Sequence, residues 1–424
     1  MQVFKFGGAS VRNAEAVRNV FRILSEYQQE DLLIVVSAMG KTTNAFEKLV
    51  NSYFKDPSQC AAQLNEIKAF HHEIMSGLFA NPQSKVWEEV NNFFVEVEWM
   101  LEEEMNHGYN HTYDQVVSIG ELVSTKIIAY YLNENGFPVQ WLDARDFILT
   151  DNNYREAKID WEESEKSFKQ IYSGMSTVSG KNRGLTQGFI GCTSENFTTT
   201  LGREGSDYTA AILAYLSDAS VVTIWKDVPG VLSADPRKFS DAVLIPHMSY
   251  HDAVELTYYG ATIIHPKTIK PLQNKMIPLR VRSFENHDAT GTLIDHLAEG
   301  VHLPCFIHKA DQMLLSLSVK DFSFIAEDHL SNIFRIFSEC GVKLNLMQLS
   351  ALSFSVCIDY DERKAEEVLK ALRNDFKVLF NRGLDLYTIR HYDQNAIQKI
   401  SEGKKIILEQ RSRLTIQLVT QPSL

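Results

Sequence analysis

The first residues of the chain predict a strand that ends in a glycine turn and leads into a helix. Apolar and polar residues alternate from Gln2 to Phe6, as in a half-buried strand, and Gly7 and Gly8 follow at once. Apolar residues then recur over 17–27 at the spacing of one helix face. Such a turn lets backbone N–H groups approach a phosphate, and the helix start adds its positive dipole end. We expect Lys5, one residue before the strand ends, to reach the same pocket.

A second glycine loop lies far downstream, at 200–209, with the sequence TLGREGSDYT. It also opens a helix, because an apolar helical pattern follows from Ala210 to Leu216. One loop supplies a lysine and the other supplies Arg203 and Asp207. Either loop alone fits a simple tight turn with solvated charges. Together they favour phosphoryl transfer, which is catalysed mainly by positioning and charge neutralisation.

Four sequence blocks, in this order, resemble the signature of the aspartokinases. They are KFGGAS at 5–10, SAMGKTTN at 37–44, GREGSDYT at 202–209 and WKDVPGVLSADPR at 225–237. The resemblance covers essentially the whole chain. It implies ATP-dependent phosphorylation of the side-chain carboxylate of L-aspartate to 4-phospho-L-aspartate, the first step towards lysine, methionine and threonine. It also implies Mg²⁺, bound mainly through the nucleotide phosphates.

The resemblance also assigns roles to individual residues. Lys5 and Asp207 are the expected catalytic residues: the lysine neutralises the transferring phosphoryl group, and the aspartate orients the phosphates, their Mg²⁺ or the neighbouring lysine. Glu121 is expected to hold the substrate ammonium and Arg203 its α-carboxylate. The other expected substrate contacts are Ser37, Thr43 and Ser206. The expected nucleotide contacts are Lys5, Gly7, Gly8, Ser10, Lys226, Asp227, Leu232, Arg237 and Thr262. No residue is expected to bind the metal directly.

Without the resemblance, two of these residues have simpler interpretations. Thr43 fits the capping of a helix, a task that threonine performs well. Glu121 follows Ser118-Ile119-Gly120 and precedes an apolar helical run, so it fits an acidic residue in the first turn of a helix, where it interacts favourably with the dipole. Both interpretations remain open on the sequence alone.

The chain departs from the aspartokinase pattern at two positions of the expected site. Glu204 stands where the family usually has glycine, which puts a carboxylate beside the phosphate site. We expect it to point outward or to pair with a lysine such as Lys41 or Lys181. Thr262 stands where many relatives have lysine, so a cation that contacts the nucleotide is lost or supplied elsewhere.

Three regions are expected, beginning with an α/β catalytic domain over 1–298. By resemblance this domain has the three-layer amino-acid kinase fold with a mainly parallel sheet. The pattern over 313–380 is strand, helix, strand, strand, helix, strand, which is ferredoxin-like and typical of a small ACT ligand-sensing domain. We therefore expect a first ACT domain over 299–382.

A shortened second ACT-like unit is expected over 383–424. It lacks a final helix and strand, and Cys305–Lys309 is a candidate for the missing strand because aspartokinases nest one ACT domain in the other. Lysine or threonine are the candidate effectors, although relatives that bind lysine often carry an acidic residue in place of Asn345 and a polar one in place of Leu349. The two units also fit plain dimerisation domains, and we expect a homodimer or larger assembly through them.

Composition limits the class of partner. The formal net charge of −12 disfavours nucleic acid or an anionic membrane as a partner. The five cysteines are scattered without metal-ligand spacing, as in a protein of the reducing cytoplasm. The first residues form no signal peptide pattern, and no apolar stretch is long enough to span a bilayer. The expectation is a cytoplasmic, monofunctional enzyme, since the sequence ends before any homoserine dehydrogenase domain.

Two other functions are compatible with parts of the pattern. One is another kinase of the same superfamily, acting on acetylglutamate, glutamate, carbamate or UMP, but these lack the paired ACT-like tail. The other is a catalytically inactive amino-acid sensor, in which the kinase fold is only a scaffold. An inactive protein would be expected to lose Lys5 or Asp207, and both are present.

Overall fold

The computed structural model describes residues 1–102, 107–175, 177, 180–261, 264–321 and 323–421. The chain divides into two compact units. The first consists of Met1–Val231, Leu244–His251 and Ile263–Glu299, and the second of Leu232–Val243, Asp252–Thr262 and Gly300–Leu424. The expected Thr262 contact lies outside the described residues.

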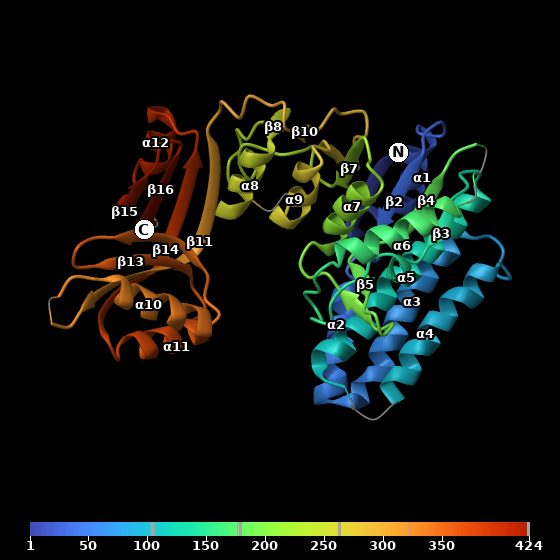
Figure 1. The fold of residues 1–424 in the computed structure, drawn as a ribbon, viewed down its shortest axis with the longest axis horizontal. Helices are drawn as coiled ribbons and strands as arrows, with labels where there is room; N and C mark the ends of the chain where they lie inside the picture. The colour runs from blue at the N-terminus through green and yellow to red at the C-terminus, as the bar shows by residue number, and fades with distance from the viewer. Residues whose placement is uncertain (103–106, 176, 178–179, 262–263, 322, 422–424) are drawn as a thin grey trace. The chain divides into compact units, whose positions relative to one another are not determined.

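The first unit is built on an eight-stranded sheet in the order β3-β4-β2-β1-β7-β9-β10-β8 (Figure 1). All neighbouring strands pair in parallel except β9 and β10. The strands are β1 (Gln2–Phe6), β2 (Leu32–Val36), β3 (Gln140–Leu142), β4 (Arg183–Gln187), β7 (Val221–Lys226), β8 (His247–Ser249), β9 (Leu279–Ser283) and β10 (Thr292–Asp295). β2 is buried along its whole length, as its continuous apolar run predicts. The mainly parallel α/β fold is therefore confirmed.

Helices form most of the first unit between β2 and β3. The helices of this unit are α1 (Ala14–Ser25), α2 (Thr42–Lys55), α3 (Cys60–Leu78), α4 (Lys85–Glu102), α5 (Tyr109–Glu134), α6 (Trp161–Ser173), α7 (Gly205–Leu216) and α9 (Pro266–Asn274). α8 (Tyr250–Tyr259) spans the division between the units. A small hairpin of β5 (Ile190–Cys192) and β6 (Thr198–Thr200) precedes the second glycine loop. Short 3₁₀ turns lie at Gly8–Val11, Pro57–Gln59 and Ala144–Asp146.

Glu121 corrects one interpretation of the sequence. It lies in the middle of α5 rather than in the first turn of a helix, so a favourable dipole contact does not explain it. Gly120 before it is not a helix boundary either. A Cβ there would lie 3.3 Å from side-chain atoms of Phe46 and of Thr42, so this glycine allows α2 and α5 to pack closely.

Four adjacent parallel strands define the edge of the sheet where a site is expected. β4, β2, β1 and β7 are neighbours, and their carboxyl ends lie at the same edge because parallel strands run in one direction. The loops after these strands therefore converge. Ligands of open α/β sheets bind at this edge.

The second unit contains a six-stranded antiparallel sheet in the order β12-β13-β11-β14-β16-β15. Its strands are β11 (Cys305–Val319), β12 (Leu344–Leu349), β13 (Phe354–Asp359), β14 (Phe376–Arg390), β15 (Lys405–Arg411) and β16 (Thr415–Gln421). Its helices are α10 (Glu327–Glu339), α11 (Glu362–Leu372) and α12 (Gln394–Ser401). The order of strands and helices predicted over 313–380 is confirmed.

Two long strands join the halves of this sheet. β14 runs unbroken where the sequence pattern indicates two separate strands, and Cys305–Lys309 forms the first part of β11. This part of β11 pairs with residues 386–390 of β14, and β14 in turn pairs with β16 on its other side. Cys305–Lys309 thus lies beside the strands of the shortened half.

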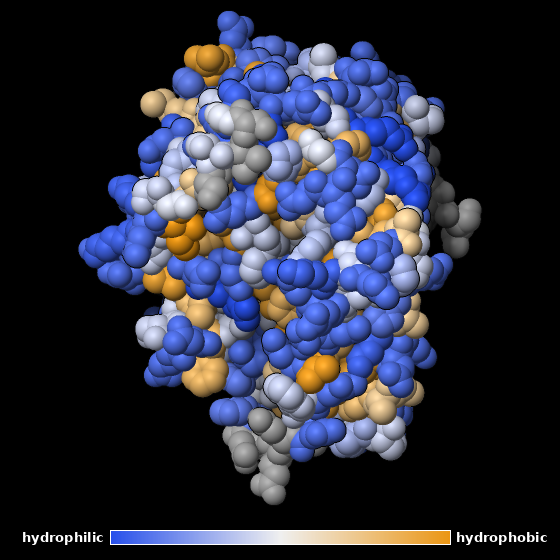
Figure 2. Space-filling view, turned by 90° about the vertical axis from the view of Figure 1, so that its right-hand side faces the viewer, coloured by the Kyte–Doolittle hydropathy of each residue, from blue (hydrophilic) through white to orange (hydrophobic). Residues whose placement is uncertain are grey.

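The face of the molecule in Figure 2 is predominantly hydrophilic. Its hydrophobic side chains are scattered rather than gathered in one broad area, which is usual for a protein surface. Among the described helices, none combines the length and the apolar character that a membrane crossing needs.

Candidate active site

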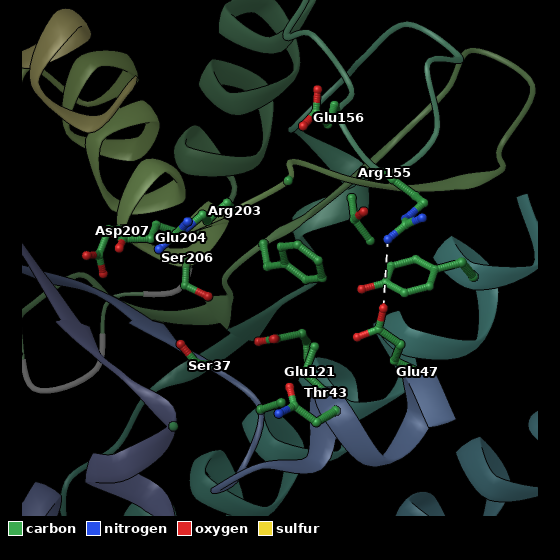
Figure 3. Close-up of a pocket in the computed structure, with 18 of the residues that line it drawn as sticks. Ser37, Thr43, Glu47, Glu121, Arg155, Glu156, Arg203, Glu204, Ser206 and Asp207 are labelled. Atoms are coloured by element: carbon green, nitrogen blue, oxygen red, sulfur yellow. Dashed lines mark ion pairs between the residues drawn. The ribbon is translucent and has the colours of Figure 1, made fainter. Parts of the chain in front are cut away.

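A pocket of about 900 Å³ lies in the first unit, where the loops after the central strands meet α2, α5 and α7. Figure 3 shows the side chains that line it. Of the predicted residues, the lining includes Lys5, Gly8, Ser37, Thr43, Glu121, Arg203, Ser206, Asp207 and Lys226. These residues come from stretches far apart in the sequence.

The centre of the charge distribution is a buried ion-pair cluster. Lys5 Nζ lies 2.6 Å from Asp207 Oδ1, and Lys226 Nζ lies 3.1 Å from Asp207 Oδ2. Burial alone would raise the pKa of Asp207, but the two lysines hold this pKa below its ordinary value. Asp207 is therefore an anion at neutral pH. Two cations around one carboxylate leave a net positive charge, which suits a phosphate group.

The loops after β1 and β2 touch through their backbones at Gly8. A Cβ on Gly8 would lie 2.7 Å from the carbonyl oxygen of Gly40 and 2.9 Å from that of Ala38. The Gly40 N–H also donates a hydrogen bond of 3.0 Å to the Gly8 carbonyl oxygen. Only glycine fits here, because real Cβ atoms do not approach backbone atoms so closely.

Replacing Gly8 with alanine is expected to lower kcat/KM by about tenfold to a hundredfold, because the two loops must separate and misplace Lys5 and Ala38. The measurement is steady-state kinetics together with a melting curve. Gly174→Ala is the matched control, since its φ is −89° and its nearest contacts are an ordinary 3.6 Å. Kinetics of Gly8→Ala equal to those of the control would contradict the close packing of the loops.

Glu121 presents to the pocket a carboxylate with one unpaired oxygen. The residue is 3% exposed, and its Oε2 atom accepts no hydrogen bond from a described residue. Burial raises the pKa of Glu121 to about 8, against the opposing effects of Lys5 and of the Ala38 N–H. A positively charged donor would relieve this cost, so the arrangement fits an ammonium group.

Arg203 directly precedes the N-cap of α7 and Ser206 lies in the first turn of that helix, beside Asp207 (Figure 3). Arg203 is exposed and makes neither a hydrogen bond nor an ion pair with a described residue. Ser206 is 9% exposed and packs against Gly188, where a Cβ would collide with it. Thr43 is the second residue of α2 and lines the pocket. The N-cap of this helix is Lys41 and no side chain caps it, so the interpretation of Thr43 as a helix cap is wrong.

Glu204 corrects an expectation, because it does not point outward. It lines the pocket beside Arg203 and Asp207 (Figure 3), and its Oε2 atom is buried without a hydrogen bond from a described residue. Burial raises its pKa, and the cation that acts on it most strongly is Lys226 rather than Lys41 or Lys181. Its φ is +55°, a left-handed conformation in which glycine is unstrained.

The remaining predicted nucleotide contacts do not line this pocket. Gly7 and Ser10 flank Gly8, and the Ser10 N–H donates to the Gly7 carbonyl oxygen. Asp227 is exposed at the end of β7. Leu232 and Arg237 belong to the second unit, where the Arg237 guanidinium pairs with Asp235 at 2.8 Å. Their nucleotide contacts stay predictions.

The sequence patterns did not indicate the other side of the pocket. Glu47, Tyr113, Arg155 and Glu156 line it and were not predicted. Glu47 could have been found, since it lies four residues after Thr43 and so on the same face of α2. No sequence pattern indicates Arg155. Its position depends on a left-handed backbone conformation and on a hydrogen bond to Asp114, which is distant in the sequence.

Among the residues that the structure describes, no group of three or more His, Cys, Asp or Glu side chains could hold a metal ion. Both carboxylate oxygens of Asp207 already face lysines. The donor set therefore fits a divalent cation that arrives with, and stays mainly on, the phosphates of a nucleotide.

Comparison with known proteins defines the class first. Residues 1–283 match the model of the amino acid kinase family, which is more than half of the 424 residues. The Arabidopsis thaliana protein named aspartokinase 1, chloroplastic, is 30% identical over 417 residues, covering 96% of this chain and 69% of that protein. Escherichia coli aspartokinase III, solved in complex with lysine and aspartate, superposes with a TM-score of 0.84 at 26% identity, over 99% of this chain and 95% of that one. The chain belongs to the aspartokinases of the amino acid kinase family.

Other relatives are longer. The bifunctional aspartokinase/homoserine dehydrogenase of Daucus carota is 30% identical over 402 residues, which is 90% of this chain but 42% of that protein. The chain thus spans less than half the length of these bifunctional relatives.

Proposed function

We propose that the protein is an aspartate kinase, which transfers the γ-phosphoryl group of ATP to the side-chain carboxylate of L-aspartate. The observation that carries the proposal is the combination, in one pocket, of the Lys5–Asp207–Lys226 cluster with the carboxylate of Glu121, of which one oxygen is unpaired. The first group suits a phosphate and the second suits an ammonium. The family membership supports the same assignment.

The reaction needs no general base. The aspartate side chain has an ordinary pKa of about 3.9, so it is already an ionised nucleophile at neutral pH. Its oxygen forms a bond to the γ-phosphorus while the bond from that phosphorus to the bridging oxygen breaks, and ADP carries away the electron pair. No proton moves in this step.

The protein must therefore neutralise charge and align the reactants. In this proposal Lys5, with Lys226 beside it, neutralises the transferring phosphoryl group, and Asp207 fixes both ammonium groups. Glu121 binds the substrate ammonium, and Arg203 offers its planar fork to the α-carboxylate. Ser37, Thr43 and Ser206 complete the aspartate site, and Gly7, Gly8 and Ser10 approach the phosphates.

We propose that Mg²⁺ binds together with the nucleotide. When bound, Mg²⁺ neutralises charge on the β- and γ-phosphates. The chain's own part is to leave these phosphates accessible beside Lys5 and the start of α7, whose N–H groups favour anions.

Regulation and assembly are further parts of the proposal. The ferredoxin-like halves of the second unit are proposed to sense lysine or threonine, because a solved relative is described as a complex with lysine. We also propose a homodimer or larger assembly through this unit, which light scattering at micromolar concentration tests. A cytoplasmic location belongs to the proposal as well, although the plant relatives are named chloroplastic.

An ADP-release assay with a panel of acids tests the substrate. We expect turnover with ATP, Mg²⁺ and L-aspartate, and rates near background with L-glutamate and N-acetyl-L-glutamate. N-acetylation removes the ammonium that Glu121 would bind. Preferred turnover of another acid would retain a kinase and overturn aspartate as its substrate. The aspartate reaction repeated with lysine or threonine identifies the effector.

A further inference from the structure

A second cavity of the first unit lies between α2 and α3, and its volume is about 220 Å³. None of the described residues that line it also lines the active-site pocket. An engineered apolar cavity of about 150 Å³ is large enough to bind benzene. The cavity between α2 and α3 therefore has room for an aromatic ring with a short polar substituent.

The start of α2 separates this cavity from the active-site pocket. The residues of this segment that line the active-site pocket are Gly40, Thr43, Asn44 and Glu47. Those that line the second cavity are Lys41, Thr42, Ala45 and Lys48. Each set has the i, i+3, i+4, i+7 spacing of a single helix face. One face of α2 thus borders the active-site pocket and the adjacent face borders the second cavity.

The walls of the second cavity are largely apolar. Ala45 comes from α2, and Ile67 and Phe70 come from α3. Ile67 is 4% exposed, so the cavity reaches the packed interior between the helices. Phe70 also lies close to the turn before α2, because a Cβ on Gly40 would be 3.4 Å from its ring. A molecule packed against Phe70 would therefore support the turn that leads into the active-site pocket.

Gln63 adds a buried polar group to this apolar lining. Its side chain is 7% exposed, and its Nε2 atom donates a hydrogen bond of 2.9 Å to Ser52 Oγ. Its Oε1 atom is buried and accepts no hydrogen bond from a described residue. A buried acceptor without a donor destabilises the fold. A ligand with an O–H or N–H group would relieve this cost.

The charged residues of the cavity favour an anion. Lys41 and Lys48 are exposed, and neither forms an ion pair with a described residue. Glu66 is also exposed and is the one carboxylate among the described lining residues, so cations outnumber anions. A ligand with an apolar body and a carboxylate would bury the body and leave the charge near the lysines.

We propose that the cavity between α2 and α3 is a regulatory site for a small aromatic carboxylate that carries a hydrogen-bond donor. Its ring occupies the space beside Ile67 and Phe70, its donor reaches Gln63, and its carboxylate lies near Lys48. Binding supports the arrangement of α2 in which Thr43 lines the active-site pocket, so it favours aspartate binding. The site is independent of the proposed function, whereas its coupling to aspartate rests on that function.

Calorimetric titration with 4-hydroxyphenylacetate tests the site, because this compound combines the ring, the donor and the carboxylate. We expect a dissociation constant of about 1 mM or lower. Phenylacetate lacks the hydroxyl and p-cresol lacks the carboxylate, and each should bind about twofold to tenfold more weakly. Saturating L-aspartate should leave the compound bound. Displacement by aspartate would place the compound in the active-site pocket and overturn the proposal.

Two variants locate the compound in the cavity. Ala45→Met fills the space and should weaken binding at least tenfold, with folding checked by a melting curve. Lys48→Met changes an exposed side chain and should weaken binding about twofold to fivefold. Lys55→Met is the matched control, since Lys55 is an exposed lysine at the end of α2, outside the cavity. Binding by wild type that neither cavity variant weakens relative to this control would contradict the site.

Steady-state kinetics test the coupling. Saturating 4-hydroxyphenylacetate should lower the KM for aspartate about twofold to fivefold in wild type and in Lys55→Met, and leave it unchanged in Ala45→Met. Aspartate should tighten binding of the compound by the same factor, because coupling between two sites is reciprocal. An unchanged KM in the presence of bound compound would overturn the regulatory role. Absence of aspartate phosphorylation by wild type would instead overturn the proposed function, while the titrations still decide whether the site exists.

Discussion

Replacing Lys5 with methionine is expected to lower kcat by about a thousandfold or more. The reaction brings an anionic carboxylate to an anionic phosphoryl group, and electrostatic stabilisation of such a transition state is usually the largest catalytic contribution. Lys5 is buried and fixed by Asp207 at 2.6 Å, so its charge is already oriented before the substrates bind. Methionine keeps the length and the apolar contacts of the side chain and removes only the charge.

The measurement is kcat together with the dissociation constant of aspartate. The dissociation constant should change little, because Lys5 is assigned to the phosphoryl group rather than to the amino acid. Lys126→Met is a matched control, since Lys126 lies over the Trp141 ring and pairs with Glu89 in another part of the first unit. A Lys5→Met protein with kcat within tenfold of wild type would refute the catalytic assignment.

Replacing Glu121 with glutamine is expected to raise the KM for aspartate about a hundredfold while it stabilises the fold at alkaline pH. The first effect follows because a charge-assisted hydrogen bond between a buried carboxylate and an ammonium is roughly twice as strong as a neutral one. The second follows from the pKa of Glu121, which burial raises from 4.5 to about 8. Between these values the folded protein binds more protons than the unfolded chain, so this group's contribution to stability is complete below 4.5 and is lost as the pH rises towards 8.

The test compares melting temperatures of wild type and Glu121→Gln at pH 5, 7 and 8.5. The variant should gain a few degrees over wild type as the pH rises across this range. Glu204 also has a raised pKa, but it is present in both proteins, so the difference between them isolates Glu121. In parallel, the wild-type KM for aspartate should fall as the pH rises from 6 to 8, because Glu121 must lose its proton to bind an ammonium. A constant difference in melting temperature with an unchanged KM would contradict both roles.

The sequence predicted those parts of the site that depend on patterns of residues close together in the chain. Lys5 and Gly8 follow from a strand that ends in a glycine turn, and the start of α7 follows from the second glycine loop. Their meeting through Asp207 is a tertiary feature, which only the family resemblance anticipated. The position of Glu121 was misread because it was interpreted as a residue in the first turn of a helix, whereas α5 already begins at Tyr109.

Arg155 and Glu204 show why the rest was missed. Both residues have a left-handed backbone conformation, which cannot be predicted from the presence of an arginine or a glutamate in the sequence. The strain at Arg155 is maintained by Asp114, which is distant in sequence and buried. Similarly, the long strand β14 crosses a stretch that reads as a break, because its pairing with β11 overrides the local pattern. Tertiary contacts decide each of these features.

The proposed function is tested most directly by identifying which carboxylate of L-aspartate becomes phosphorylated. The protein is incubated with ATP, Mg²⁺ and L-aspartate in the presence of hydroxylamine, which traps an acyl phosphate as a hydroxamate. The product is then compared with authentic α- and β-aspartyl hydroxamates by chromatography and mass spectrometry. We expect the β-hydroxamate, formed in equal amount to ADP and absent with Lys5→Met. The α-hydroxamate, or ADP without any hydroxamate, would contradict the proposed function.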